Sequence, residues 1–156
     1  MMKIAIFAAA LVLITGALEA RAVQPDADFR SIVPSGWTLQ APDPKSNLRR
    51  FVSPQHDAWL VLYAEPADRE SVRAHMAAVK AVDGARITYQ REEPDWIVVS
   101  GFRGSRIFYR KAMLACGGRR WHQIDFEYPA EQKLAFDRFV TRAAYALQAY
   151  AAVGCS

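Results

Sequence analysis

The sequence contains only two cysteines and three histidines, and neither type occurs at a spacing typical of a metal or redox site. Cys116 and Cys155 are too far apart for the Cys-x-x-Cys pattern that activates a thiol. His56, His75 and His122 lack a second histidine, a cysteine or paired carboxylates at ligand spacing, although a metal site needs three or four converging ligands. We therefore expect no metal ion and no cofactor.

Catalytic and nucleic-acid-binding motifs are also missing. There is no Gly-x-Ser-x-Gly elbow, and residues 101–105 (GFRGS) predict a hairpin turn rather than a phosphate loop. Acid–base chemistry by Asp125 or Glu127 with His122 is disfavoured, because strand alternation sends His122 to the other face. Pairs of adjacent basic residues occur at positions 49–50, 110–111 and 119–120, and strand alternation sends the two members of each pair to opposite faces. The clustered basic surface of a nucleic-acid-binding protein is therefore absent.

Long apolar runs are absent after residue 17, whereas a membrane-spanning helix needs about 20 apolar residues. The N-terminal run, Ile4–Ala17, follows a basic start and leads to residues 20–22 (ARA), which is the pattern of a secretory signal peptide. An uncleaved anchor is the alternative, but Glu19 and Arg21 interrupt the run too early. We expect cleavage after Ala22 and a periplasmic or secreted product without a stable membrane anchor.

The chain that remains carries 18 basic and 15 acidic residues, and its apolar content suits one domain with one core. Residues 23–35 contain acidic residues and two prolines and are predicted to form a loose N-terminal arm. Residues 36–156 are predicted to form a single α+β domain.

Alternating or apolar segments bounded by turn residues predict an antiparallel sheet of about five to seven strands. A first helix is expected after Asp68, which is a plausible N-cap, with Val72, Met76 and Val79 at helical spacing. A long second helix is expected after Pro129. The predicted strands are Trp37–Gln40, Leu48–Ser53, Ala58–Ala64, Arg86–Arg91, Asp95–Gly101, Ser105–Cys116 and Arg119–Tyr128.

The glycine-bearing turns predict strand registers. A loop at 117–118 sets Tyr109 opposite Phe126 on a mostly apolar face, and Arg110 opposite Asp125 on the other face. A loop at 103–104 likewise sets Val98 near Tyr109 and Val99 near Phe108, so that the hairpin is apolar on both sides. A strand that is apolar on both sides is covered on both sides. We therefore expect the long helix on one face of the sheet and the shorter helix on the other.

Three short segments stand out, at residues 34–37 (PSGW), 51–54 (FVSP) and 60–62 (LVL), together with the final helix. They resemble those of PsbP-like α/β/α domains. The chain as a whole, with residues 101–104 (GFRG) and 126–129 (FEYP), looks like small secreted bacterial proteins. The resemblance implies an α/β/α sandwich and a non-catalytic accessory role beside a larger assembly. It carries no active-site motif onto this chain.

Cys116 and Cys155 are predicted to form a structural disulfide, since an even cysteine count in an exported chain favours pairing. The bridge would close about 40 residues and stabilise the fold by about 4 kcal/mol on the chain-entropy estimate. Two free thiols and a redox pair are the alternatives.

One constellation qualifies as a binding site for a ligand or partner: Arg110, Trp121, Gln123 and Asp125 share one face of the predicted hairpin. The same alternation places Arg106, Arg119 and Glu127 beside them as additions to the site. The competing interpretation is a cross-strand ion pair between Arg110 and Asp125 on a solvated face. The remaining tryptophans, at positions 37, 59 and 96, are expected in the core.

The leading hypothesis for function is a non-catalytic periplasmic or secreted module that binds an unknown envelope protein or other envelope component. The alternative is a small-molecule or lipid carrier with a pocket between sheet and helix, lined by Tyr109, Phe126 and Phe139. An exposed aromatic patch would favour the first hypothesis, and a cavity would favour the second.

Overall fold

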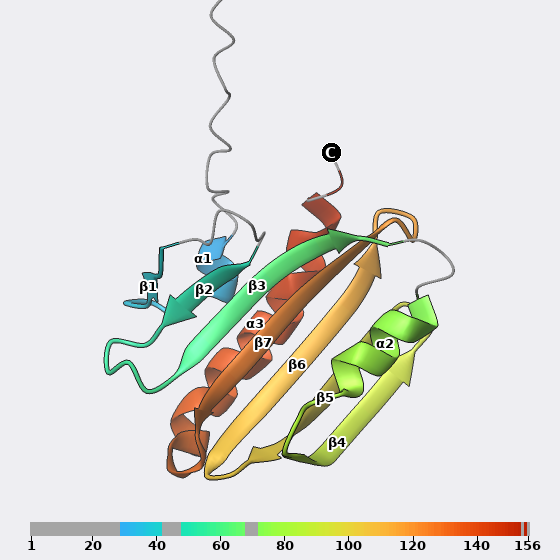
Figure 1. The fold of residues 1–156 in the computed structure, drawn as a ribbon. Coiled ribbons are helices and arrows are strands. Elements are labelled where there is room, and N and C mark those ends of the chain that lie inside the picture. The colour runs from blue at the N-terminus through green and yellow to red at the C-terminus, as the bar shows by residue number, and fades with distance from the viewer. Residues whose placement is uncertain (1–28, 42–47, 68–71, 154, 156) are drawn as a thin grey trace, which may run out of the picture.

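The computed structural model describes residues 29–41, 48–67, 72–153 and 155. They form a seven-stranded antiparallel sheet in the order β1-β2-β3-β7-β6-β5-β4, with helices on both faces (Figure 1). In chain order the elements are α1 (Phe29–Ile32), β1 (Thr38–Leu39), β2 (Arg49–Val52), β3 (Trp59–Pro66), α2 (Val72–Lys80), β4 (Ala85–Glu93), β5 (Trp96–Arg103), β6 (Arg106–Ala115), β7 (Arg120–Pro129), a 3₁₀ turn (Ala130–Gln132) and α3 (Lys133–Val153). The predicted fold class is confirmed.

The β6–β7 hairpin has the register that the sequence predicts, with Tyr109 opposite Phe126 and Arg110 opposite Asp125. Its turn is longer than the two glycines alone, because the strands end at Ala115 and resume at Arg120. Residues 116–118 all adopt positive φ in this turn, a conformation that glycine tolerates best.

The predicted register of the β5–β6 hairpin is wrong by two residues. Val98 lies opposite Lys111 and Val99 lies opposite Arg110, because the turn falls at residues 104–105 rather than 103–104. Gly104 supplies the positive φ of 58° that this turn requires. A shift by two residues leaves every side chain on its predicted face.

The two longer helices cover opposite faces of the sheet and are offset from each other (Figure 1). α3 packs on β6 and β7 over a core that includes Ile124 and Phe126, and we call this side the α3 face. α2 packs on β5 and β6 over a core that includes Phe108 and Trp121, and we call this side the α2 face. Within the described residues, the offset leaves β3 little covered on the α2 face and β4 little covered on either face.

Both helices form where the apolar periodicity predicts them. Met76 and Val79 are the buried residues of α2, and the chain turns away after it at Gly84, whose φ is 66°. The predicted N-cap Asp68 lies outside the described residues. The apolar stripe of α3 is likewise buried, fully at Phe136, Val140, Ala143 and Leu147, and partly at Phe139 and Tyr150.

The structure differs from the predicted N-terminal arm in its second half. Residues 29–32 form α1, which packs against α3, and Ile32 is fully buried in the core of the α3 face. Burying a whole isoleucine side chain contributes about 1.5–3 kcal/mol, which explains why this part of the arm is held on the domain. The predicted signal peptide and cleavage site, residues 1–22, lie outside the described residues.

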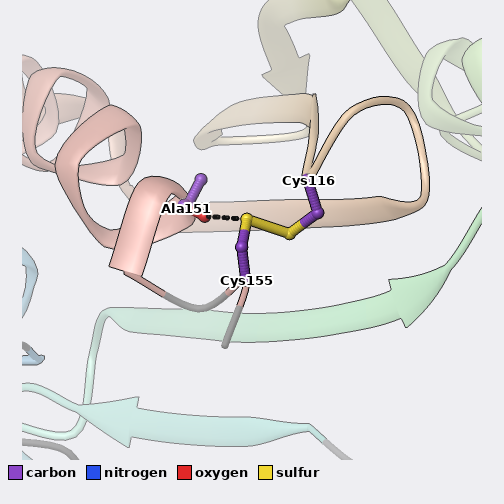
Figure 2. The surroundings of a disulfide bond; sticks show 3 residues. All are labelled: Cys116, Ala151 and Cys155. Atoms are coloured by element: carbon purple, nitrogen blue, oxygen red, sulfur yellow. Dashed lines mark hydrogen bonds between the residues drawn. A yellow bond between two sulfur atoms is a disulfide. The ribbon is translucent and has the colours of Figure 1, made fainter.

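Cys116 and Cys155 form the predicted disulfide (Figure 2). The bond joins the β6–β7 turn to the chain just beyond α3, and the Cys155 Sγ lies 3.2 Å from the carbonyl oxygen of Ala151 in the last turn of that helix. Disulfides persist in oxidising compartments, so the pairing indicates an extracytoplasmic protein. Among the described residues, no helix combines the length and the hydropathy that crossing a membrane requires.

Candidate functional site

A shallow pocket of about 120 Å³ opens on the α2 face, beside α2 rather than beneath it. We call it the Trp59 pocket. The strand pairings place its side chains together: Glu127 of β7 lies opposite Trp59 of β3 on one side and opposite Phe108 of β6 on the other. The charged and apolar lining residues include Trp59, Val61, Arg103, Arg110, Asp125 and Glu127.

Glu127 is buried at the back of the pocket and both of its carboxylate oxygens are paired. Arg106 Nε donates to Oε1 at 2.8 Å, and Arg103 Nη1 donates to Oε2 at 3.0 Å. Arg106 is fixed further because its Nη2 also donates to the carbonyl oxygens of Asp57, at 2.7 Å, and of Glu127 itself, at 3.2 Å. Pairing of both oxygens offsets the cost of burying this carboxylate, and it also immobilises two guanidinium groups.

Trp59 is only half-buried, which corrects the expectation that it belongs to the core. The guanidinium carbon of Arg106 lies 4.3 Å from its ring centroid, and that of Arg50 lies 4.9 Å from the centroid. Both distances are within the range of cation–π attraction. Within the described residues Arg50 has no carboxylate within ion-pair distance, so its charge is available to a ligand.

A second ion pair closes the side of the pocket next to α2. Arg110 Nε lies 3.1 Å from Asp125 Oδ2, and Gln123 Nε2 donates to Asp125 Oδ1 at 2.8 Å. Arg110 Nη1 donates to the carbonyl oxygen of Val79, so the same side chain ties the sheet to α2. Burial raises the pKa of Asp125 despite the attraction of Arg110 and the hydrogen bond from Gln123. This pair holds the position of α2 at the edge of the pocket.

The structure brings together three of the four residues predicted for the site. Arg110, Gln123 and Asp125 form one hydrogen-bonded group, and the predicted cross-strand pair of Arg110 with Asp125 is present. Trp121 instead lies beneath α2, 1% exposed, with the ring of His75 stacked on it at a centroid distance of 4.2 Å. It therefore packs in the core of the α2 face rather than facing a ligand.

The aromatic residue that faces the pocket is Trp59. The sequence suggests Arg106, Arg119 and Glu127 only as additions to the site. Glu127 lines the pocket and Arg106 donates to its carboxylate, whereas Arg119 is exposed in the β6–β7 turn. Sequence reasoning missed Trp59 and Arg103. The one available signal is that Trp59 begins an apolar strand with alternating burial, but nothing local indicates that this strand lies beside β7.

The three histidines lie in three different environments. His122 is buried under α3 with its ring edge against Tyr150, and burial, together with the nearby Arg120 charge, lowers its pKa. Burial also lowers the pKa of His75, although its Nδ1 lies 2.8 Å from Glu65 Oε1. His56 occupies an exposed turn with positive φ. In the described part of the chain, no three histidine, cysteine or acidic residues gather as a metal site would require.

These lowered pKa values predict that acid destabilises the fold. Below about pH 6.5 the unfolded chain binds protons at His75 and His122 that the folded chain does not, so the free energy of unfolding falls as the pH falls. Urea unfolding of wild type and His122→Phe at pH 7.5 and 5.5 should show a smaller pH dependence in the variant. Leu134→Ala, an exposed substitution on α3 that removes no titrating group, serves as the control and should keep the wild-type dependence. Equal pH dependence in wild type and His122→Phe would contradict the assignment.

No protein-family model matches this sequence, and no curated protein matches it. Among solved structures, the chain is similar to the solution structure of cyanobacterial PsbP (CyanoP) from Synechocystis sp. PCC 6803. The TM-score is 0.52 at 13% sequence identity, over 73% of this chain and 82% of that chain. The fold is therefore PsbP-like, as the sequence resemblance predicts. A likeness at this level of identity concerns the fold and not the activity.

Proposed function

We propose that this protein is a non-catalytic binding module of the periplasm or the extracellular space, and that its partner contacts the Trp59 pocket. The proposal includes export by the N-terminal signal with cleavage after Ala22. The observation that carries it is a half-exposed tryptophan held between two guanidinium groups, Arg50 and Arg106, on a sheet. Tryptophan and arginine are the side chains most enriched among residues that dominate binding energy at interfaces.

The surroundings of Trp59 support recognition because they are already ordered. Arg103 and Arg106 are held by Glu127, and Arg110 is held by Asp125 and by Val79 of α2. Side chains that are immobilised before a partner arrives lose less conformational entropy on binding. The free charge of Arg50 and the exposed part of Arg103 favour a partner that brings a carboxylate or another acidic group to this surface.

The carrier alternative receives less support from the same observations. Phe126 is buried and Phe139 packs against Phe136 at a centroid distance of 6.1 Å, so both residues contribute to the core between sheet and α3. The Trp59 pocket lies on the opposite face, and its volume of about 120 Å³ corresponds to only a few water molecules. A lipid chain needs far more space.

The test places a photo-crosslinking amino acid at position 61 of the full chain, in the lining of the Trp59 pocket, and in a matched protein at position 134, which is exposed on α3. The proposal predicts one reproducible crosslinked product from position 61 and not from position 134. Trp59→Ala should weaken this product about tenfold or more, as expected for a dominant interface residue, while circular dichroism shows the fold retained. N-terminal sequencing of the same exported material should begin at Val23.

Identical products from both positions, or a product that is insensitive to Trp59→Ala, would overturn the assignment of the surface. Stabilisation of the protein by a lipid, with no crosslinked protein at position 61, would favour the carrier. All three substituted positions are exposed or half-buried, so no result depends on a disrupted core.

A further inference from the structure

β4 forms one edge of the sheet, and its side chains are exposed along nearly all of its length. Ile87 and Tyr89 are 41% and 53% exposed there. An edge strand presents unpaired backbone groups to which another extended strand can bind. We propose that β4 pairs with β4 of a second copy of this chain, antiparallel and about a two-fold axis at Gln90. The two sheets would then form one continuous sheet.

The alternation of β4 is reset by a bulge between Ile87 and Tyr89. Arg86 lies opposite Phe102 of β5, and Tyr89, Arg91 and Glu93 follow on the same α3 face as their partners Ser100, Val98 and Trp96. The extra residue of the bulge therefore puts Arg86 in line with three later side chains, although it is an odd number of positions from each of them. Four side chains of β4 thus form one row along its free edge.

This row is complementary to itself in the antiparallel direction. The positions are counted with Thr88 as the extra residue of the bulge, because Ile87 and Tyr89 pair with consecutive residues of β5. With the axis at Gln90, Tyr89 of one copy then lies opposite Arg91 of the second copy. Arg86 lies opposite Glu93 of the second copy. The symmetry makes each pairing occur twice, as an isologous two-fold interface requires. Opposite charges and cation–π pairs directly across a strand pair are stabilising.

Neighbouring registers are unfavourable. An axis at Tyr89 sets Arg86 against Arg91 of the second copy, and an axis at Arg91 sets that arginine against itself. Like charges directly opposite each other destabilise strand pairing. The charge pattern of β4 therefore favours the register with its axis at Gln90 over both neighbouring registers.

The groups involved are available in the single chain. The guanidinium group of Arg86 rests on the ring of Phe102 at 4.9 Å and has no carboxylate partner among the described residues. Glu93 is paired only with Arg91, at 3.0 Å on an exposed surface, which is a weak interaction. Within the described residues neither α2 nor α3 packs extensively on β4, so no helix obstructs its edge. The Trp59 pocket lies on other strands, and the inference is independent of the proposed function.

The test is sedimentation equilibrium of the full chain over about a hundredfold range of concentration. Wild type should show a reversible monomer–dimer equilibrium. Arg86→Glu and Glu93→Arg should each weaken the dimer at least about tenfold, because each replaces two attractive pairs by two repulsive ones. The double variant R86E/E93R restores opposite charges and should recover dimerisation. Arg138→Glu, an exposed charge reversal on α3, should dimerise as wild type does.

A monomeric wild type at every concentration would overturn the proposal. It would also fail if the dimer were weakened equally by Arg138→Glu, which would indicate an effect of net charge alone. A double variant that remains as weak as the single variants, with an unchanged melting temperature, would exclude the register with its axis at Gln90. Melting temperatures of all variants distinguish a lost interface from a lost fold.

Discussion

Replacing both Cys116 and Cys155 by serine is expected to lower the free energy of unfolding by about 4 kcal/mol. The bond spans 39 residues, and cross-linking a loop of that length removes a corresponding amount of conformational entropy from the unfolded chain. Urea unfolding of the double variant, compared with oxidised wild type, measures the difference.

Reduced wild type provides the control, because it lacks the bond but keeps both side chains. Its stability should fall to within about 1 kcal/mol of that of the double-serine variant. A double variant as stable as oxidised wild type would contradict this expectation, because it would show that the disulfide does not lower the conformational entropy of the unfolded chain. The folded structure of the variant should be retained, since the bond joins two elements that also meet through the packing of α3 on β7.

The second large effect is expected from Phe126→Ala, which should lower the free energy of unfolding by about 3–5 kcal/mol. Phe126 is 1% exposed at the centre of β7, between Leu60 and Tyr109 of the flanking strands, and the ring of Trp37 meets it at 6.1 Å. Removing the ring costs its transfer free energy and leaves a cavity beside β3, β6 and the segment that holds Trp37.

Leu134→Ala is the matched control for this variant. Leu134 lies on α3 but is 88% exposed, so removing its side chain should change the stability by no more than about 0.5 kcal/mol. Chemical unfolding monitored by tryptophan fluorescence is suited to the comparison because Trp37 contacts the mutated site. Equal effects of the two substitutions would contradict the assignment of the α3 face as the principal core.

The sequence predicts those features that depend on neighbouring residues. The turn glycines at 117–118 define the β6–β7 register, and helical spacing defines the buried side of α3. The β5–β6 register is mistaken because 103–104 and 104–105 are both plausible turns, and only tertiary packing distinguishes them. The sequence does not predict the burial of Ile32, because a single turn of helix has too few residues to show a periodicity.

The candidate site depends on contacts that no local pattern encodes. Trp59 and Glu127 are adjacent because β3 pairs with β7, and these strands are separated by most of the domain. Which tryptophan is exposed depends on where α2 sits, since α2 covers Trp121 and leaves Trp59 open. Strand alternation correctly groups Arg110, Gln123 and Asp125 on one face, but it cannot show which part of that face a helix will cover.

The strand order has a further consequence, for the way the chain folds. β4 to β7 form one meander, and β1 to β3 form another, in which every pairing joins strands adjacent in sequence and needs little loop closure. The two meanders join only where β3 meets β7, through the longest-range contacts of the sheet. The Trp59 pocket straddles that junction, with Trp59 and Val61 on one side and Asp125 and Glu127 on the other. A partner bound at the pocket, as proposed above, would contact both meanders and stabilise their junction against partial opening.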